Sequence, residues 1–303
     1  MMERKDSIAL GIGLMLFFCL VAPLIDVSSK LAAQQVSSGT VTLWRYIWQG
    51  LLMLPVVLAM RLPMAMSRRA WGLTFLRGAV SALSTFCFVA AIRTMPIADA
   101  LAIAFVEPFI ILLIGHFLLN ETVGPRRLGA AVVGFIGALF VIQPSFSVFG
   151  AVALLPLGTA FGFALYILIT RQLSSEVHPV TMQLHTALTG TLVCLPVLAF
   201  GEVSGIDQLG FSWPHGIFWL WLFGVGFFAT VSHMAMTYAL GYAPASTLAP
   251  LHYFEMLSST FFSYLVFSDF PDPLSWLGIA IIVASGLYLI HRERVTARKA
   301  SGR

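Results

Sequence analysis

The sequence predicts an all-α membrane protein with ten transmembrane helices, arranged as two inverted five-helix repeats. Composition is the first reason: of 303 residues, 59% are hydrophobic and only 10% are charged. A soluble domain of this size could not cover so much apolar surface with a polar outer layer. The second reason is a series of long apolar segments. The third is a pattern that recurs after 148 positions.

Ten segments approach the roughly 20 apolar residues that a transmembrane helix needs. The connections between them are short, and none is long enough for an inserted soluble domain. We expect the N-terminal apolar segment to be the first span and not a signal peptide, because it is longer than a typical signal-peptide core. The predicted spans lie near 8–30, 40–60, 72–94, 97–119, 126–143, 149–170, 180–200, 216–240, 244–267 and 274–291.

Most of the basic residues fall on one side of this ten-span arrangement. They precede the first span, lie between the second and third, follow the fourth and sixth, and fill the C-terminal segment HRERVTARKASGR. The loops near 143–149, 201–215 and 268–273 contain neither Lys nor Arg. Cytoplasmic loops carry the excess of Lys and Arg, so both termini are predicted to be cytoplasmic. Because the basic residues follow membrane topology, we expect no nucleic-acid partner.

A duplicated unit accounts for the recurring pattern. The segment PIADALAIAFVE, residues 96–107, is matched 148 positions later by PASTLAPLHYFE, residues 244–255. The same offset places Gly78 on Gly226. The predicted division is a first half over 1–147, a second half over 148–291 and a basic cytoplasmic tail over 292–303. Five spans are an odd number, so the second half must enter the membrane upside down, as in many secondary transporters.

Glu107 and Glu255 are the leading functional candidates. Glu107 lies eleven residues after Pro96, and Glu255 lies eleven residues after Pro244. That separation is roughly 16 Å along a helix, which places both carboxylates near the middle of the bilayer. Ionised carboxylates at that depth are costly unless they are paired, hydrated or protonated. One interpretation is that both line a central cavity and bind substrate or a proton. The other is that each bonds a backbone group or a neighbouring helix in a structural role.

The chain resembles the EamA type of the drug/metabolite transporter superfamily. The resemblance rests on the Pro-x10-Glu helix of the fourth span and on LNETVGPRRLGAAVVGFIGALFVIQP, with its weaker copy SDFPDPLSWLGIAIIVASGLYLI. The second copy departs from the first where Pro108 is replaced by Met256. The resemblance implies transport of a small organic metabolite across the bacterial inner membrane. Its members include riboflavin importers, which makes riboflavin the lead substrate and export of amino acids or other metabolites the alternative.

Four further residues are candidates for substrate contact. Arg45 and Trp44 lie in the second predicted span, where an arginine needs a counter-ion or an aromatic face. Arg45 is equally consistent with an anionic or ring-bearing substrate and with an interface anchor, and Trp44 with the aromatic belt. His252 and Tyr253 lie within one turn of Glu255, where Tyr253 offers a stacking face and His252 a hydrogen bond. Ordinary packing is the alternative for both.

The first predicted span contains the gate candidates Pro23 and Asp26. Asp26 and Lys30 are spaced i, i+4, and a simple ion pair near the outer end is the favoured interpretation. A proline-loosened first helix that acts as a gate is the other. Arg77 is expected either to follow the positive-inside rule near the inner end of the third span or to bind a neighbouring loop. His233 is expected to be an ordinary core histidine.

No sequence motif indicates an enzyme, a metal site or a cofactor. The three cysteines lie in separate apolar segments, and the chain has no CxxC, HExxH, P-loop or GxSxG pattern. A membrane-embedded enzyme or a lipid flippase remains the alternative from another functional class. Small-residue spacings favour close helix packing but do not specify an oligomer. The expected partners are therefore a small metabolite and the lipid bilayer.

Overall fold

The computed structural model describes residues 8–117, 125–174, 176–242, 248, 251 and 254–301. These residues form helices joined by loops, with no strand among them. Six helical stretches are long and apolar enough to span a membrane, and shorter apolar helices accompany them. The predicted all-α membrane architecture is confirmed. The six stretches cover residues 9–32, 38–59, 68–92, 145–173, 179–204 and 218–242.

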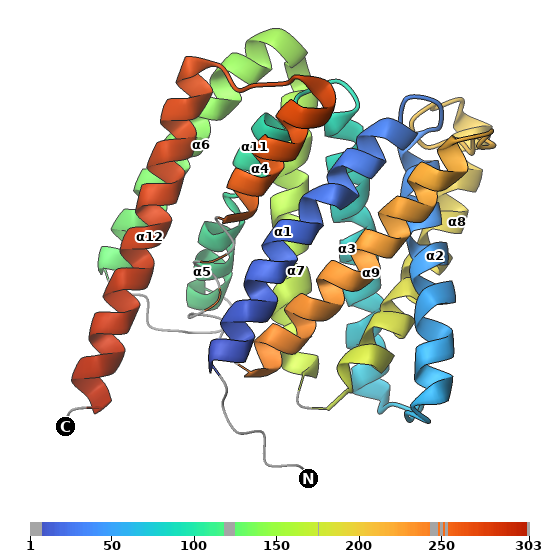
Figure 1. Ribbon diagram of the computed structural model, residues 1–303, viewed down its shortest axis with the longest axis horizontal. Coiled ribbons are helices and arrows are strands. Elements are labelled where there is room, and N and C mark those ends of the chain that lie inside the picture. The colour runs from blue at the N-terminus through green and yellow to red at the C-terminus, as the bar shows by residue number, and fades with distance from the viewer. Residues whose placement is uncertain are drawn as a thin grey trace.

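Within the described residues, the helices follow one another as five passes in each half of the chain (Figure 1). The first half contains α1 (Ile8–Ala32), α2 (Ser38–Ala59), α3 (Arg68–Ile92), α4 (Ile97–Ala104), α5 (Glu107–Phe117) and α6 (Pro125–Phe149). The second contains a 3-10 turn η1 (Gly150–Leu154), α7 (Leu155–Leu173), α8 (Pro179–Ser204), α9 (Phe218–Tyr242), α11 (Phe254–Phe267) and α12 (Pro273–Ser301).

Short polar signals set several helix boundaries. The side chains of Ser37 and Ser67 accept hydrogen bonds from the backbone amides three residues on and so begin α2 and α3. Asp272 does the same for α12 by accepting hydrogen bonds from the Leu274 and Ser275 amides. Partial burial raises the pKa of Asp272, but the bonds from Ser275 and Leu274 outweigh it and hold that pKa below its usual value.

Two predicted elements differ from the structure, and a third lies partly outside the described residues. The fourth span, 97–119, is two helices, α4 and α5, separated by a turn at Phe105 and Val106. The ninth span, 244–267, is described mainly from residue 254 onward, as α11. The predicted tail does not leave the last helix at 291, because α12 continues to Ser301. The ten-span count is therefore an approximation that treats α4 and α5 as one pass.

The contacts between helices have the pairing that a twofold repeat requires. If α1, α2, α3, α5 and α6 correspond to α7, α8, α9, α11 and α12, each contact should have an exchanged counterpart. Contacts α1–α9 and α3–α7 are such a pair, and so are α2–α9 and α3–α8, and α1–α11 and α5–α7. Two contacts, α2–α8 and α6–α12, are their own counterparts and so lie across the repeat axis. The two halves are thus interleaved.

Two glycines matched by the sequence repeat occupy equivalent close approaches. A Cβ atom on Gly78 of α3 would lie 2.0 Å from Thr189 Oγ1 of α8. A Cβ atom on Gly226 of α9 would lie 2.2 Å from Trp48 Cβ of α2. Both crossings therefore need a residue without a side chain, and the repeat places that residue at the same point in each half.

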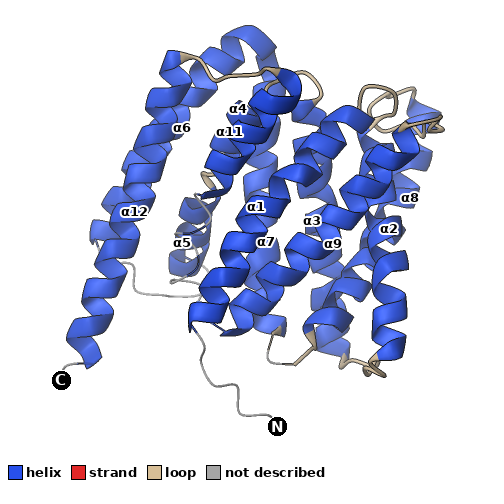
Figure 2. Ribbon diagram, viewed as in Figure 1, coloured by secondary structure: helices blue, strands red, loops and turns tan. Residues whose placement is uncertain are grey.

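The ends of the bundle are distinct. α1 begins and α12 ends at the same end, and most loops lie at one end or the other (Figures 1 and 2). Arg69 and Glu176 form an exposed ion pair of 3.3 Å between the start of α3 and the α7–α8 connection. Since helix direction alternates, this pair lies at the end where α1 begins. The opposite end contains the α1–α2, α3–α4, α8–α9 and α11–α12 connections.

Alanine at Gly78 or Gly226 should destabilise the protein, because overpacking a close crossing costs about 1–3 kcal/mol. Gly72 is the matched control on α3, since a Cβ atom there would meet nothing within 4 Å. We expect Gly78→Ala and Gly226→Ala to lower the thermal unfolding midpoint of the detergent-purified protein and Gly72→Ala to leave it unchanged or higher. Equal midpoints for all three variants would contradict the proposed crossings.

Candidate functional site

Glu107 begins a half-helix in the middle of the fourth pass. α4 ends at Ala104, and α5 starts at Glu107 after a two-residue turn. The sequence explains the interruption: Pro108 has no backbone N–H for the carbonyl four residues earlier, and proline is well tolerated in the first turn of a new helix. The prediction of one continuous helix through Glu107 is therefore wrong, and its carboxylate lies at a helix N-terminus.

Glu255 has the equivalent position in the second repeat. It is the second residue of α11 and lies in its first turn. Glu107 and Glu255 are 4% and 7% exposed, so both carboxylates are buried. The dipole of a helix N-terminus stabilises negative charge, which lowers the cost of an ionised carboxylate inside a membrane.

Both glutamates line one central cavity of about 110 Å³. The cavity is formed by α1, α2, α3, α4, α5, α7, α9 and α11, so both repeats contribute to it. Aromatic walls come from Phe18, Phe88, Phe105 and Phe163. The other polar lining residues are Asp26, Arg45, Ser81, Ser84, Thr85, Thr159 and His233. The predicted residues Asp26, Arg45, Glu107 and Glu255 are thereby brought together.

Arg45 is buried and held by its neighbours. It is 8% exposed, and its guanidinium donates from Nη1 to Thr85 Oγ1. Nη2 lies 3.0 Å from His233 Nε2. The structure thus places Arg45 in the cavity wall and not at the membrane interface. His233, expected to be an ordinary core histidine, also lines the cavity.

The other predicted contact residues lie elsewhere or outside the described part of the chain. Trp44 is not among the cavity-lining residues; its ring packs edge-on against Trp219 at 4.7 Å, in the α2–α9 interface. His252 and Tyr253 lie outside the described residues.

Pro23 joins α1 to α11. A proline at this position frees the Cys19 carbonyl of its helical hydrogen bond. Ser258, one turn after Glu255, donates its hydroxyl to that carbonyl at 2.5 Å. Such a substitute bond is how membrane helices tolerate proline. α1 remains continuous across Pro23. The carbonyl of Cys19 that Pro23 leaves free therefore links α1 to α11, two helices of the cavity wall.

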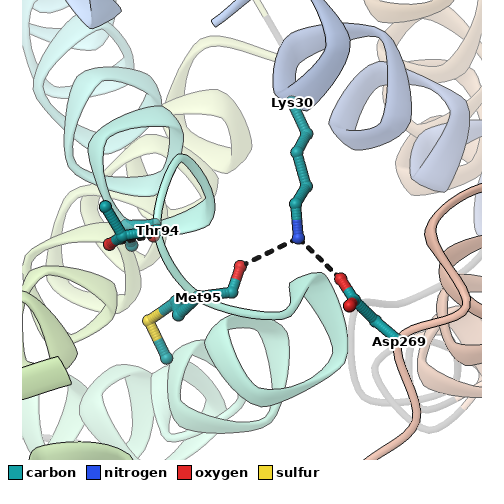
Figure 3. Close-up of polar contacts among 5 residues, drawn as sticks. Lys30, Thr94, Met95 and Asp269 are labelled. Carbon is teal, nitrogen blue, oxygen red and sulfur yellow. Dashed lines mark hydrogen bonds and ion pairs between the residues drawn. The ribbon is translucent and has the colours of Figure 1, made fainter. Parts of the chain in front are cut away.

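The predicted Asp26–Lys30 pair is replaced by a longer-range one. Asp26 lines the cavity, whereas Lys30 Nζ lies 2.7 Å from Asp269 Oδ2. Lys30 also donates to the Met95 carbonyl at 3.2 Å. Figure 3 shows the lysine reaching from α1 between the α3–α4 turn and the α11–α12 loop. The i, i+4 spacing suggested the wrong partner because a flexible lysine can reach a carboxylate from another segment.

Lys30 lies in an acidic environment at the end of the bundle opposite the start of α1. Asp99, in the first turn of α4, interacts electrostatically with Asp272, Asp269 and Lys30. Asp99 is 6% exposed. The lysine therefore neutralises carboxylates from both repeats and holds three segments together at this end.

Among the described residues, no group of three or more His, Cys, Asp or Glu side chains is arranged to hold a metal ion. The cavity instead combines aromatic faces, hydroxyls, one arginine and three carboxylates. These groups suit reversible binding of a polar organic molecule.

The sequence matches the EamA-like transporter family over residues 9–143 and again over 150–291. A riboflavin transporter of Brucella anthropi is 26% identical over 284 residues, covering 93% of this chain and 99% of the relative. An S-adenosylmethionine uptake transporter of Rickettsia felis is 25% identical over 284 residues, covering 94% and 93%. A pseudopaline exporter of Pseudomonas aeruginosa is 26% identical over 236 residues, covering 76% and 78%.

A solved crystal structure has the same fold. Its chain superposes with a TM-score of 0.63 at 19% identity, covering 94% of this chain and 97% of the other.

Removing the charge of Lys30 should loosen the end of the bundle that it holds. Lys30→Met leaves Asp99 and Asp269 without their cation, so the repulsion between them favours separation. We expect faster labelling of a cavity cysteine, Ser84→Cys, by an impermeant maleimide applied from that end, in a chain whose native cysteines are replaced. Lys30→Arg is the matched control and should label at the original rate. Identical labelling rates for Lys30→Met and Lys30→Arg would show that the charge of Lys30 does not hold this end of the bundle closed.

Proposed function

Because the chain belongs to the EamA-like transporter family, we propose that this transporter is a secondary carrier of a small organic metabolite in the bacterial inner membrane. Riboflavin is the lead substrate. Transport proceeds by alternating access, in which the two inverted halves exchange conformations and expose one central site to either side. Family membership also makes the chain a transporter and not an enzyme.

The single observation that carries this proposal is the pairing of Glu107 and Glu255. Glu107 is the first residue of α5, Glu255 lies in the first turn of α11, and both line one cavity. Interrupted helices that meet at a midplane site are typical of secondary transporters with inverted repeats. Buried carboxylates there can hold a substrate group or exchange a proton during each cycle.

Riboflavin is supported by relatives and by the shape of the cavity wall. Relatives named riboflavin transporter occur in three bacterial species, at 26% to 28% identity. The rings of Phe18, Phe88, Phe105 and Phe163 offer apolar faces to a flat heterocycle. The cavity of about 110 Å³ is smaller than the roughly 300–1,000 Å³ typical of ligand pockets. Loading therefore requires the walls to separate, as alternating access provides.

A cationic metabolite is the second candidate, on the evidence of charge. Three carboxylates, Asp26, Glu107 and Glu255, share the cavity with one arginine, Arg45. A surplus of acidic groups favours a substrate with a positive centre. The S-adenosylmethionine uptake transporters among the relatives make that compound the natural comparison. Export is the other alternative, since a carrier follows the gradients of its substrate and coupling ion.

The proposed orientation places both termini in the cytoplasm. The described basic residues Arg61, Arg68, Arg69 and Arg171 belong to connections at the end where α1 begins. The positive-inside rule assigns that end to the cytoplasm. The Lys30–Asp269 contact then closes the outer side, and its release is the step that opens the site outward. Reporter fusions at each loop test this orientation directly.

Transport should be measured with the purified protein in liposomes against tritiated riboflavin and S-adenosylmethionine. Each compound is tested with and without a pH gradient and with and without a membrane potential. Saturable riboflavin uptake that excess unlabelled riboflavin inhibits supports the lead substrate. Uptake of S-adenosylmethionine but not of riboflavin makes the cationic candidate, and not riboflavin, the substrate. Failure of correctly inserted protein to move any compound in a wider metabolite panel would refute the carrier mechanism.

Glu107→Gln and Glu255→Gln should each lower the transport rate by roughly tenfold or more, because each removes a charge-assisted interaction in the cavity. Glutamine keeps the volume, so membrane insertion and thermal stability should change little. Glu176→Gln is the matched control, because Glu176 lies in an exposed ion pair away from the cavity. Normal transport by both cavity variants would restrict the two glutamates to a structural role.

A further inference from the structure

A chain of polar side chains leads from the cavity into the helix bundle. It begins at Arg45 of α2, whose Nη2 lies 3.0 Å from His233 Nε2 of α9. His233 Nδ1 lies 3.3 Å from Tyr166 Oη of α7. Arg77 of α3 donates from Nη2 to the same Tyr166 oxygen at 2.6 Å. Four helices are thus connected through consecutive hydrogen bonds.

Arg77 anchors the inner end of this chain. Its side chain has no exposed surface, and its Nε donates to Thr170 Oγ1 at 2.7 Å. Nη1 donates to Thr186 Oγ1 and, at 3.4 Å, to the Met182 carbonyl. The guanidinium also lies 4.2 Å from the centre of the Tyr166 ring. The expected topological or loop-clasping role is therefore wrong: Arg77 is a buried connection between α3, α7 and α8.

The hydrogen-bond partners assign the tautomer of His233. A guanidinium has donors but no acceptor, so His233 Nε2 must accept from Arg45. In a neutral imidazole the other nitrogen then carries the proton, and Nδ1–H donates to Tyr166 Oη. The tyrosine oxygen accepts from both His233 and Arg77. An imidazolium would instead place an N–H against the donor of Arg45, so the arrangement requires neutral His233.

Aromatic packing fixes the plane of the histidine ring. The rings of Phe18 and Phe163 approach His233 edge-on, with centroid distances of 6.0 and 6.2 Å. Phe163 also stacks on Tyr166 at 5.6 Å with an angle of 9° between the planes. The imidazole therefore has little freedom to rotate away from Arg45, and the tyrosine hydroxyl is held in register with it.

Two of the three guanidinium nitrogens of Arg45 have hydrogen-bond partners in the protein, and the third has none among the described residues. Nη1 is bonded to Thr85, whose hydroxyl also lies 3.2 Å from Tyr46 Oη, and Nη2 is bonded to His233. Arg45 Nε is buried and has no hydrogen-bond partner within the described structure. A buried donor without a partner is costly, and a bound ligand that supplies an acceptor removes that cost.

We propose that His233, Tyr166 and Arg77 are positioning residues that hold Arg45 so that its Nε–H receives an acceptor atom of the substrate. The inference rests on the proposed transport function and specifies the substrate class: a metabolite with a carbonyl, carboxylate or ring-nitrogen acceptor. Positioning in advance lowers the entropy lost on binding, so the effect belongs to substrate affinity. The maximal transport rate depends on the opening of the halves and is affected less.

Tyr166→Phe is the most selective test, because it removes one hydroxyl and keeps the ring. In liposomes with tritiated riboflavin, or with S-adenosylmethionine if that is the transported compound, we expect the half-saturation concentration to rise roughly three- to tenfold. The maximal rate should stay within about twofold, since the cavity wall itself is unchanged. Tyr264→Phe is the matched control on the exposed face of α11 and should alter neither value.

A double-mutant cycle with Arg45→Lys separates positioning from general packing. Lysine keeps the charge but lacks the guanidinium fork that His233 orients. Tyr166→Phe in the Arg45→Lys background should then change the half-saturation concentration by less than about twofold. The same three- to tenfold rise in both backgrounds, or no rise in the wild-type background, overturns the proposal. Thermal unfolding of each variant identifies any that fail to fold.

Nitrogen NMR tests the geometry without relying on transport. The difference between spectra of ¹⁵N-histidine-labelled protein and its His233→Gln variant isolates the His233 ring. We expect a neutral ring with the proton on Nδ1, and a shift of its signals in Tyr166→Phe. An imidazolium or a proton on Nε2 overturns the assignment. If the wild-type protein moves neither compound, the proposed function fails separately, and this spectrum decides the positioning chain by itself.

Discussion

The interaction between a buried carboxylate and the N-terminus of a half-helix governs the arrangement of this protein. Hydrocarbon offers no solvation for charge, so a glutamate at that depth needs stabilisation supplied by the fold. Glu107 starts α5 and Glu255 lies in the first turn of α11, so the dipole of each helix N-terminus favours the negative charge. The interrupted pass, the central cavity and the meeting of the two repeats all follow from this requirement.

The sequence was sufficient for the architecture because the bilayer imposes strong, local constraints. Span length, alternating basic loops and the repeated Pro-x10-Glu segment each follow from the chain itself, and together they predict two inverted halves. The turn at Phe105 and Val106 was missed because apolar residues continue across it, so the hydropathy pattern predicts one helix. Pro108 was the available signal: it cannot complete the helical hydrogen bond to the carbonyl four residues earlier.

The candidate site was predicted only where local chemistry is unusual. Asp26, Arg45 and both glutamates are charges in apolar segments, and all line the cavity. Their partners could not be predicted, because Arg45 and His233 are 188 positions apart. A histidine in an apolar helix looks the same in sequence whether it fills space or orients an arginine. Only the packing of α2 against α9 distinguishes the two roles.

The glycine crossings limit how such a bundle can deform. At Gly78 and Gly226 the facing atoms already lie closer than a Cβ atom would allow. Shear along either crossing would drive a backbone into a side chain, whereas rotation about the contact point keeps the separation constant. The interfaces α3–α8 and α2–α9 are therefore pivots. In the proposed alternating-access cycle, residues far from these two points travel the greatest distance, so the loops that close each face move most and the crossings least.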